Sequence, residues 1–327
     1  MKVLVLGAGG FIGNQLVSRL KREGHYITGI DLRYPLFGQT DADNFVIGDL
    51  RDKKVCQLHI TSEYDEVYQL AADMGGAGYL FTGENDFQVM HNSASINLNV
   101  VECAIRAGVS KLFYSSSACI YPKCNQLDPS NPNCIESSAY PADPDSEYGW
   151  EKLFSERLYQ NASKAHKLDV RIARFHNVYG PGNEFSNNKA KAPAAICRKV
   201  AMAENGESIE IWGPGTQTRS FLYIDDCLDG ILELMDSEYS DPVNIGSEEM
   251  ISINDFAQLA INISGKNLTV VNIDGPIGVN GRNSNNDLIR NICDWEPKVS
   301  LSSGAARLYK WVEAECEKIK LEPIIKA

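Results

Sequence analysis

Three features are scarce or absent in this sequence, and each absence argues against a class of protein. No apolar run approaches the ~18 residues that a membrane-spanning helix needs. The short apolar stretch at Val3–Leu6 ends at a glycine turn, so a first strand explains it better than a signal peptide does. Basic residues are outnumbered, with 31 Lys and Arg against 43 Asp and Glu. The net charge of -12 argues against a general binder of nucleic acids or anionic membranes.

The nine cysteines show no paired spacing. Cys119, Cys124 and Cys134 are near one another, but no CxxC motif or histidine completes a zinc pattern, so we expect no metal site. Dispersed thiols in a chain of 327 residues fit a reducing compartment, where free cysteines act as small buried apolar side chains. We therefore expect a cytoplasmic protein.

Short apolar segments rich in β-formers alternate with helical patterns in the first half of the chain. The predicted strands are Val3–Leu6, Tyr26–Ile30, Phe45–Ile47, Glu66–Leu70, Lys111–Ser115 and Leu168–Ala173, and the main predicted helices are Phe11–Arg22, Met90–Ala107 and Ser146–Lys164. Strands separated by helices predict an α/β fold with a doubly wound parallel sheet of the Rossmann type and right-handed crossovers.

The second half is less regular. Its predicted helices are 193–203, 224–235, 253–263 and 301–320, and its predicted strands are 209–212, 220–223 and 242–245. This pattern suggests a smaller α/β substrate lobe that is interleaved with the sheet and is not a separate downstream domain. We expect residues 1–173 with 218–247 to form the dinucleotide-binding domain, and residues 174–217 with 248–327 to form the substrate lobe.

A glycine turn follows the first predicted strand and opens the first predicted helix. Gly7, Gly10 and Gly13 allow a tight turn and a close approach to a pyrophosphate, which the free N–H groups at the helix N-terminus would bind. Asp31 ends the second strand, where a carboxylate accepts hydrogen bonds from the adenosine ribose and repels a 2′-phosphate. NAD is therefore the expected cofactor, although Arg33 is close enough to keep NADP open.

Tyr148 and Lys152 are four residues apart on a predicted helix, so both side chains point to one face. A nearby ammonium favours tyrosinate and should lower a tyrosine pKa that starts near ~10. Tyr148 can then take the proton of a sugar hydroxyl while NAD⁺ takes the hydride, and Ser117 can hydrogen-bond the same oxygen. Cys119, two residues after this serine, suggests that a carbon acid is also deprotonated. The combination predicts oxidation followed by epimerisation.

These motifs occur in the order found in a known superfamily. The chain resembles the extended short-chain dehydrogenase/reductases and, within them, the GDP-mannose 3′,5′-epimerases. The segments that carry the resemblance are Ala71–Gly76, Ser116–Pro122, Arg174–Pro181, Lys191–Ala195, Trp212–Gly213, Gln217–Phe221, Val243–Ser247 and Gly281–Ser284. The glycine turn and the Tyr/Lys pair are common to the superfamily, whereas Ser-Ala-Cys and Lys-Ala-Pro-Ala-Ala are much more specific.

The resemblance implies inversion of a GDP-hexose at C3 and C5, as from GDP-mannose to GDP-L-galactose or GDP-L-gulose. Oxidation of C4 to a ketone makes the C3 and C5 protons acidic. The resemblance gives the two opposed acid/base groups as Cys119 and Lys191. Lys191 would need burial or a cationic neighbour to work near neutral pH, because an ordinary lysine pKa is ~10.4. The cofactor is regenerated in each cycle, so it should stay bound.

The full set of predicted site residues divides into three groups. The catalytic residues are Ser117, Cys119, Tyr148, Lys152 and Lys191. The cofactor-binding residues are Gly7, Gly10, Phe11, Ile12, Gly13, Asp31, Asp49, Leu50, Ala71, Tyr148 and Lys152, with Asp49 expected against the adenine amine. The substrate-binding residues are Gly75, Ser117, Cys119, Asn177, Lys191, Lys199, Gln217, Arg219 and Arg282, and Trp212 is expected in the core. The partners implied are a GDP-sugar substrate and a second copy of the chain, paired through the helices Met90–Ala107 and Ser146–Lys164.

One departure from the family pattern leaves alternatives open. The family usually has Glu directly before the catalytic lysine, where this chain has Ala190. The substrate could therefore be another GDP-sugar, such as a heptose or a 4-keto derivative. A nucleotide-sugar 4-epimerase would need Tyr148 and Lys152 but not Cys119. A 4,6-dehydratase is disfavoured by Ala118-Cys119, where such enzymes have Asp-Glu. A non-catalytic NAD sensor is disfavoured because the Tyr/Lys pair is intact.

Overall fold

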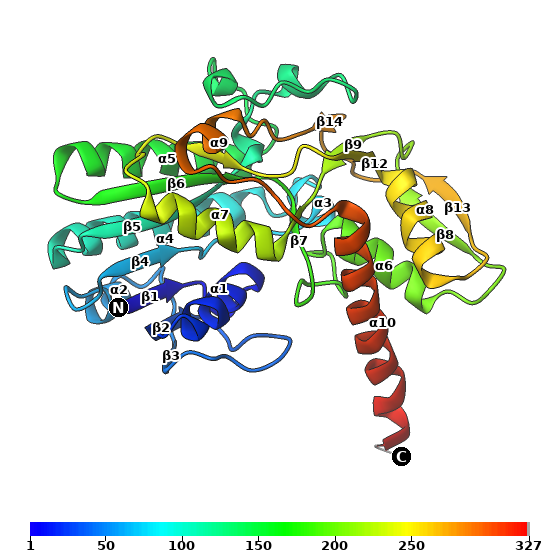
Figure 1. The fold of residues 1–327 in the computed structure, drawn as a ribbon, viewed down its shortest axis with the longest axis horizontal. Helices are drawn as coiled ribbons and strands as arrows, with labels where there is room; N and C mark the ends of the chain where they lie inside the picture. Colours follow the sequence, from blue (N-terminus) through cyan, green and yellow to red (C-terminus); the bar gives the residue numbers. More distant parts are fainter. Residues whose placement is uncertain (326–327) are drawn as a thin grey trace.

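The computed structural model describes residues 1–325, and side chains through residue 320. Seven parallel strands form its central sheet in the order β11-β6-β5-β4-β1-β2-β3 (Figure 1). In chain order they are β1 (Lys2–Leu6), β2 (Tyr26–Asp31), β3 (Asn44–Ile47), β4 (Glu66–Gln69), β5 (Lys111–Ser117), β6 (Asp169–Phe175) and β11 (Val243–Ile245). The order reverses between β1 and β4, which is the switch point of a doubly wound sheet. The predicted Rossmann-type fold class is confirmed.

Helices cover both faces of this sheet. They are α1 (Phe11–Arg22), α2 (Lys53–His59), α4 (Asp86–Ala107), α5 (Glu147–Ala165) and α7 (Ile224–Asp236). The helices α1 and α7 pack on each other, whereas α4 packs against α2 and α5. Because both faces are covered, the inner strands are nearly continuous apolar segments, as in Val3–Leu6, where every side chain is fully buried.

The second half adds a smaller set of sheets and helices and then returns to the central sheet through α7 and β11. Its helices are α6 (Ala192–Met202), α8 (Ile253–Ser264), α9 (Asp287–Cys293) and α10 (Leu301–Ile325). Its strands pair as β8 (Ser208–Trp212) with β13 (Thr269–Ile273), β9 (Thr218–Ser220) with β12 (Met250–Ser252) and β14 (Gly281–Arg282), and β7 (Val178–Tyr179) with β10 (Leu222–Tyr223). The short α3 (Ala77–Leu80) and the 3-10 turns η1 (Ala118–Ile120), η2 (Lys123–Gln126) and η3 (Glu136–Ala139) complete the chain.

Two predicted elements differ from the structure. The helix expected from Met90 begins at Asp86, because an acidic residue in the first turn is favourable at a helix N-terminus. The strand expected at 220–223 is split at Phe221 into β9 and β10, which belong to different sheets.

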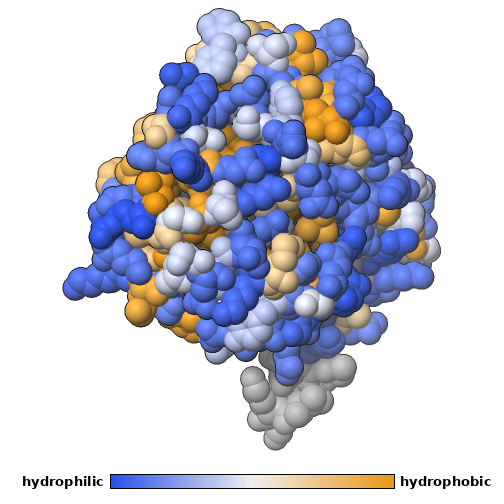
Figure 2. Space-filling view, turned by 60° about the vertical axis from the view of Figure 1, so that its left-hand side comes forward, coloured by the Kyte–Doolittle hydropathy of each residue, from blue (hydrophilic) through white to orange (hydrophobic). Residues whose placement is uncertain are grey.

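The surface bears no large continuous apolar area in the view of Figure 2, where apolar side chains form separate small patches among polar ones. Within residues 1–325, we find no helix that combines the length and the apolar composition required to cross a membrane.

A buried ion pair ties three elements of the sheet layer together. The Arg174 guanidinium of β6 meets the Glu156 carboxylate of α5 in two hydrogen bonds, Nε–Oε1 at 3.0 Å and Nη2–Oε2 at 2.9 Å. Both side chains are almost fully buried, and the Ser116 hydroxyl of β5 donates to the same carboxylate. Such a pair is expensive to break, because removal of one partner leaves a buried charge without compensation.

We expect Glu156→Gln to lower the free energy of unfolding by about 3–5 kcal/mol, since the Arg174 charge would stay buried without its counterion. Urea unfolding followed by circular dichroism measures the change. The matched control is Glu63→Gln, which breaks the Lys2–Glu63 pair, whose side chains are 54% and 52% exposed, and should leave the urea midpoint unchanged. Equal midpoints for Glu156→Gln and the wild type would contradict the role of the pair.

Candidate active site

The glycine turn between β1 and α1 has a shape that only glycine fits. Gly7 has φ 85°, and a Cβ there would lie 2.7 Å from the Ala71 backbone nitrogen. A Cβ on Gly13 would lie 2.0 Å from the Gly7 carbonyl oxygen. Gly10 is the N-cap of α1 and has no side chain to cap the free N–H groups, and Phe11 begins the helix. The turn therefore leaves backbone donors open to an anion, and these features fit a dinucleotide pyrophosphate.

Asp31 closes the predicted cofactor site at the end of β2. Its Oδ2 accepts from the Gly9 N–H at 3.0 Å, which ties the carboxylate to the glycine turn. Burial raises the pKa of Asp31, although backbone donors oppose the shift. Asp49, expected beside the adenine, is paired with Arg51 at 2.7 Å, which lowers the pKa of that aspartate. The remaining predicted cofactor residues are the half-buried Ile12 and Ala71 and the buried Leu50.

The start of α5 positions Tyr148 and Lys152. The Ser146 hydroxyl accepts from the Gly149 N–H at 3.2 Å, and this cap fixes the first turn of the helix. Lys152 is buried, and its Nζ donates to the Ser115 carbonyl of β5 at 2.6 Å. The same Nζ lies 5.7 Å from the centre of the Tyr148 ring. The structure therefore brings the predicted pair together at the end of β5.

The expected lowering of the Tyr148 pKa is wrong for the protein alone. Burial raises this pKa well above its ordinary value, and the nearby Cys119 and Glu151 raise it further. The Ser117 hydroxyl opposes the shift by hydrogen bonding. The pKa of Lys152 is itself lowered by burial. The sequence spacing suggested that the Lys152 charge would lower the Tyr148 pKa. The loss of solvent around the phenol has the larger effect and raises this pKa.

Cys119 lies in η1, directly after β5, with only 9% of its surface exposed. Arg282 Nη1 approaches its Sγ at 3.1 Å. The backbone N–H of Cys119 donates to the Ser117 hydroxyl at 3.2 Å. A Cβ on Gly149 would lie 2.2 Å from the Cys119 carbonyl oxygen, so α5 packs directly on the turn that carries the thiol. Burial raises the pKa of Cys119, and the Arg282 charge opposes that increase.

Arg282 joins this thiol to two residues that the sequence did not reveal. Its Nε donates to Gln126 Oε1 at 2.7 Å, and its Nη2 forms an ion pair with Asp145. All three side chains are buried or nearly so. Gln126 and Asp145 belong to no recognisable motif. The one sequence signal that could have identified either of them is that Asp145 precedes Tyr148 by three residues. The predicted substrate residue Arg282 is therefore placed beside the thiol.

Lys191 and Lys189, which the sequence could not separate without the resemblance, have different surroundings. Lys191 is the N-cap of α6, is half-buried, and has a pKa lowered by burial. The Cys119 charge opposes this shift. A Cβ on Gly76 would lie 3.4 Å from the Lys191 Cα, and Tyr79, three residues after Gly76, belongs to one apolar cluster with Cys119 and Tyr148. Lys189 instead forms an ion pair with Asp73 at 3.1 Å.

Arg219 presents a guanidinium with no acidic hydrogen-bond partner among residues 1–320. Its Nη1 and Nη2 donate to the carbonyls of Thr218 at 2.7 Å and Ile277 at 3.0 Å. Burial, together with the charge of Arg282, lowers the pKa of Arg219 to about 10. A half-buried cation of this kind is well suited to a phosphate.

Other predicted substrate residues are held by the backbone. Asn177 has φ 45°, a left-handed conformation that Asn tolerates, and its amide donates to the Ser220 carbonyl at 2.9 Å. Gln217 donates to the Trp212 carbonyl at 3.1 Å, while its buried Oε1 has no partner among the described residues. Gly75 is buried against Tyr79, whose Cβ would lie 2.8 Å from a Cβ at that position.

Trp212 is not a core residue, contrary to the prediction. It is 40% exposed, and the Nζ of Lys199 lies 5.9 Å from its ring centre. The ring packs on the backbone of Gly78 and Gly275, where a Cβ would come within 3.1 Å and 2.5 Å of it. Lys199 itself donates to the Glu210 carbonyl at 2.6 Å. The two glycines let the backbone approach the indole closely, while two fifths of the residue stays exposed to solvent.

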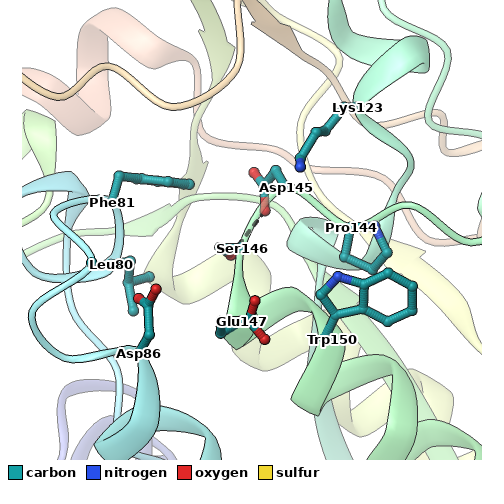
Figure 3. A pocket seen from close by; sticks show the side chains of 10 residues that line it. Leu80, Phe81, Asp86, Lys123, Pro144, Asp145, Ser146, Glu147 and Trp150 are labelled. Carbon is teal, nitrogen blue, oxygen red and sulfur yellow. Dashed lines mark hydrogen bonds between the residues drawn. The ribbon is translucent and has the colours of Figure 1, made fainter.

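A polar cavity of about 240 Å³ opens beside these residues (Figure 3). Figure 3 shows Leu80, Phe81 and Asp86 on one side, Lys123, Pro144 and Trp150 on the other, and Ser146 and Glu147 between them. Gly83 and Asp145 also line the cavity. Asp145 lines the cavity and also pairs with Arg282, which contacts Cys119. A single guanidinium therefore connects the cavity wall to the thiol. Among the described residues, no group of three His, Cys, Asp or Glu side chains is arranged to hold a metal ion.

Comparison with known proteins gives a consistent match along the chain. A family model described as the NAD dependent epimerase/dehydratase family matches residues 3–246. A GDP-mannose 3,5-epimerase of Arabidopsis thaliana is 42% identical over 322 residues, covering 98% of this chain and 84% of that protein. GDP-mannose 3,5-epimerase 1 of Oryza sativa subsp. japonica is 41% identical over 326 residues, covering 99% and 85%.

Solved structures agree on the fold. A UDP-glucuronic acid 4-epimerase from Bacillus cereus, in complex with UDP-glucuronic acid and NAD, superposes with a TM-score of 0.81 at 25% identity, covering 96% of this chain and all of that one. The UDP-glucose 4-epimerase of Thermotoga maritima gives a TM-score of 0.83 at 23% identity, covering 97% of this chain and all of that one.

We expect Arg282→Met to shift the alkylation of Cys119 to higher pH. The Arg282 charge favours the thiolate, so its removal raises the thiol pKa and lowers the thiolate fraction at any given pH. Peptide-resolved mass spectrometry after iodoacetamide treatment across a pH series measures the shift. Arg282→Lys, which keeps the charge, should shift less, and the exposed Cys124 in the same samples is the internal control. An unchanged Cys119 profile in Arg282→Met would contradict the interaction.

Proposed function

The chain belongs to the NAD-dependent epimerase/dehydratase family, and from this we propose that it inverts C3 and C5 of a GDP-hexose of the GDP-mannose type through a transient 4-keto intermediate. The observation that carries the proposal is the pairing of two acid/base groups in one site. The buried thiol of Cys119 packs in one cluster with Tyr148 and Tyr79, and the backbone of the half-buried Lys191 lies against Gly76, three residues before Tyr79.

Tyr148, Ser117 and Lys152 serve the oxidation of C4 in this proposal. Bound NAD⁺ supplies a reversible hydride acceptor at that carbon. Tyr148 removes the proton of the C4 hydroxyl, and Ser117 hydrogen-bonds the same oxygen. Lys152 places a positive charge near the phenol, with its Nζ fixed by the Ser115 carbonyl at 2.6 Å. Asp31 at the glycine turn favours NAD over NADP, because its carboxylate would repel a 2′-phosphate.

Cys119 and Lys191 serve the inversion. The ketone at C4 makes the protons on C3 and C5 acidic, so one group removes a proton and the other returns one on the opposite ring face. Burial raises the pKa of Cys119 and lowers the pKa of Lys191, so the two values approach each other. A proton can then be taken or given by either group at a small cost in free energy. A 4-epimerase would have no use for this second pair, which argues for inversion next to the ketone.

The nucleotide end of the substrate is proposed to bind the predicted substrate residues that take no part in the two chemical steps. Arg219 is the best placed for the diphosphate, because within the described part of the chain its guanidinium donates to the Thr218 and Ile277 carbonyls and to no carboxylate. Lys199 adds a positive charge beside Trp212, and Asn177, Gln217 and Gly75 are the other proposed contacts. The division into a dinucleotide-binding domain and a substrate lobe, as predicted from the sequence, remains part of the proposal.

A reducing, cytoplasmic location is proposed because all nine cysteines are free. A homodimer is also proposed, through α4 and α5, which pack on each other. An apolar groove of about 370 Å³ lies between them, lined by Leu98, Val101, Ile105, Leu158, Ala162 and Ala165 among others. Leu98, which lines the groove, is 47% exposed, and Phe154 of α5 is 48% exposed.

Light scattering should give a mass twice that of the 36.1 kDa chain for the wild type. Leu98→Asp would place a charge in the proposed interface and should shift the mass to one chain. Leu36→Asp, at a residue that is 50% exposed in the loop after β2, is the matched control and should leave the dimer intact. A single-chain mass for the active wild type would contradict the dimer.

The proposed reaction is tested with GDP-mannose in D₂O and no added NAD, followed by mass spectrometry. The wild type should incorporate deuterium into the hexose, since exchange at C3 or C5 requires the ketone. Cys119→Ala should reduce incorporation by roughly 100-fold or more, the scale of general acid/base catalysis. It should still oxidise C4, seen as the absorbance of reduced nicotinamide. Tyr148→Phe should lose both signals.

The control for the thiol is Cys124→Ala, which removes an exposed cysteine five positions along the chain and should behave as the wild type. Deuterium incorporation at the wild-type rate in Cys119→Ala would refute the role of this thiol. No incorporation by the wild type would refute GDP-mannose epimerisation itself.

A further inference from the structure

Asp73 has no part in the chemistry described so far, yet its carboxylate receives donors from three separate segments. Tyr79 of α3 donates its hydroxyl to Oδ1 at 3.0 Å, and Lys189 Nζ reaches the same oxygen at 3.1 Å. Asn92 of α4 donates to Oδ2 at 2.9 Å. The backbone N–H of Asp73 also donates to the Ser93 hydroxyl at 3.0 Å. The carboxylate is thus fixed to α4 on one side and reaches the 187–191 loop on the other.

The backbone makes a second connection between the same two segments. Gly76, three residues after Asp73, donates its N–H to the Lys189 carbonyl at 3.0 Å. A Cβ on Gly76 would lie 2.1 Å from the Ala190 carbonyl oxygen, so the two chains touch without side chains between them. The Lys189 ammonium also lies 4.1 Å from the centre of the Tyr79 ring. Lys189 is therefore held through its charge, its carbonyl and a ring face.

The held segment leads directly into Lys191. Only Ala190 separates the two lysines, and Lys191 is the N-cap from which α6 begins. The position of Lys191 is consequently fixed from both sides: by α6 after it and by the Asp73 contact before it. A general acid or base depends strongly on such positioning, because a displacement of about 1 Å can reduce a rate by ~100-fold.

Asp73 is also linked to the predicted cofactor site through hydrogen-bonded side chains. Asn92, which donates to Asp73, accepts through its Oδ1 from Arg51 Nη1 at 2.9 Å. Arg51 in turn pairs with Asp49 at 2.7 Å, the residue predicted to face the adenine. A continuous line of polar contacts therefore runs from the predicted adenine end of the site to the loop that carries Lys191.

We propose that Asp73 is a positioning residue that fixes the 187–191 loop through Lys189 and thereby places Lys191 opposite Cys119. Its effect on the reaction rests on the proposed function of Lys191. Lys189 acts in this arrangement as the anchor of the loop and takes no proton from the substrate. Asp73 should therefore affect the inversion and leave the oxidation of C4, which depends on Tyr148 and Lys152, unchanged.

The first measurement is made on the protein without substrate. Amide hydrogen exchange, resolved by peptides, is compared in the wild type, Asp73→Asn and Lys189→Met. Peptides that cover 187–191 should exchange at least roughly 10-fold faster in both variants, because local opening there is no longer opposed by the ion pair. Peptides from β1 and β5 should be unchanged, which shows that the fold is intact. Unchanged protection at 187–191 in Asp73→Asn would overturn the proposal, whatever the enzyme does.

The second measurement separates the two chemical steps with GDP-mannose. Asp73→Asn should lose roughly 10- to 100-fold in deuterium incorporation, while the rate at which reduced nicotinamide forms stays within about 3-fold of the wild type. Lys189→Met should lose as much deuterium incorporation as Asp73→Asn, whereas Lys189→Arg should keep most of it. The double variant Asp73→Asn/Lys189→Met should incorporate deuterium no more slowly than the slower single variant. Glu63→Gln is the control, because it breaks the 3.1 Å pair with Lys2, and Glu63 precedes β4 whereas Asp73 follows it.

The outcomes separate the two proposals. Equal losses in both chemical steps, or a wild-type rate of deuterium incorporation in Asp73→Asn, would overturn the positioning role. If the wild type incorporates no deuterium, the proposed reaction is wrong, and the amide exchange of the 187–191 loop alone decides whether Asp73 holds it.

Discussion

The Arg282 guanidinium is the interaction on which the rest of the site depends. It is buried, and its three nitrogens are divided among a thiol, a carboxylate and an amide that come from different parts of the chain. Its partner Asp145 lies 137 residues earlier in the sequence, so this one cation fastens the second half of the chain to the start of α5. Removal of the cation would leave the buried carboxylate without compensation and the thiol without the charge that favours its ionised form. Structure and reactivity are therefore coupled through a single side chain.

Burial is the common cause of the pKa shifts of the titratable side chains around Arg282. It raises the pKa of Cys119 and Tyr148 and lowers the pKa of Lys152 and Lys191, because each charged form loses water. The chain as a whole carries -12 charges, yet the site gathers cationic side chains from β9, β14, α5 and the start of α6. These cations sit among acidic groups, since Asp145 pairs with Arg282 and lines the cavity together with Asp86 and Glu147.

The sequence was sufficient for features that depend on nearby residues. The alternation of strands and helices predicted the sheet, and the glycine turn, Asp31 and the Tyr148/Lys152 spacing identified the ends of strands where the site lies. It could not reveal Asp145, Gln126 or the contacts of Asp73, because their partners are distant in the chain and their residue types are common on any surface. Trp212 was misjudged since residue type favours burial, whereas the glycines that flank its ring are recognised only in three dimensions. The pKa of Tyr148 was misjudged because spacing reveals a neighbouring charge but not the loss of solvent.

The strand β11 makes the central sheet depend on the second half of the chain. It comes from the second half of the chain, after the first stretch of the predicted substrate lobe, yet it forms the edge of the central sheet beside β6. A fragment that stopped at residue 173 would leave β6 as an open edge, ready to pair with other chains. The central sheet is therefore completed only after the chain has passed through the first stretch of the predicted substrate lobe.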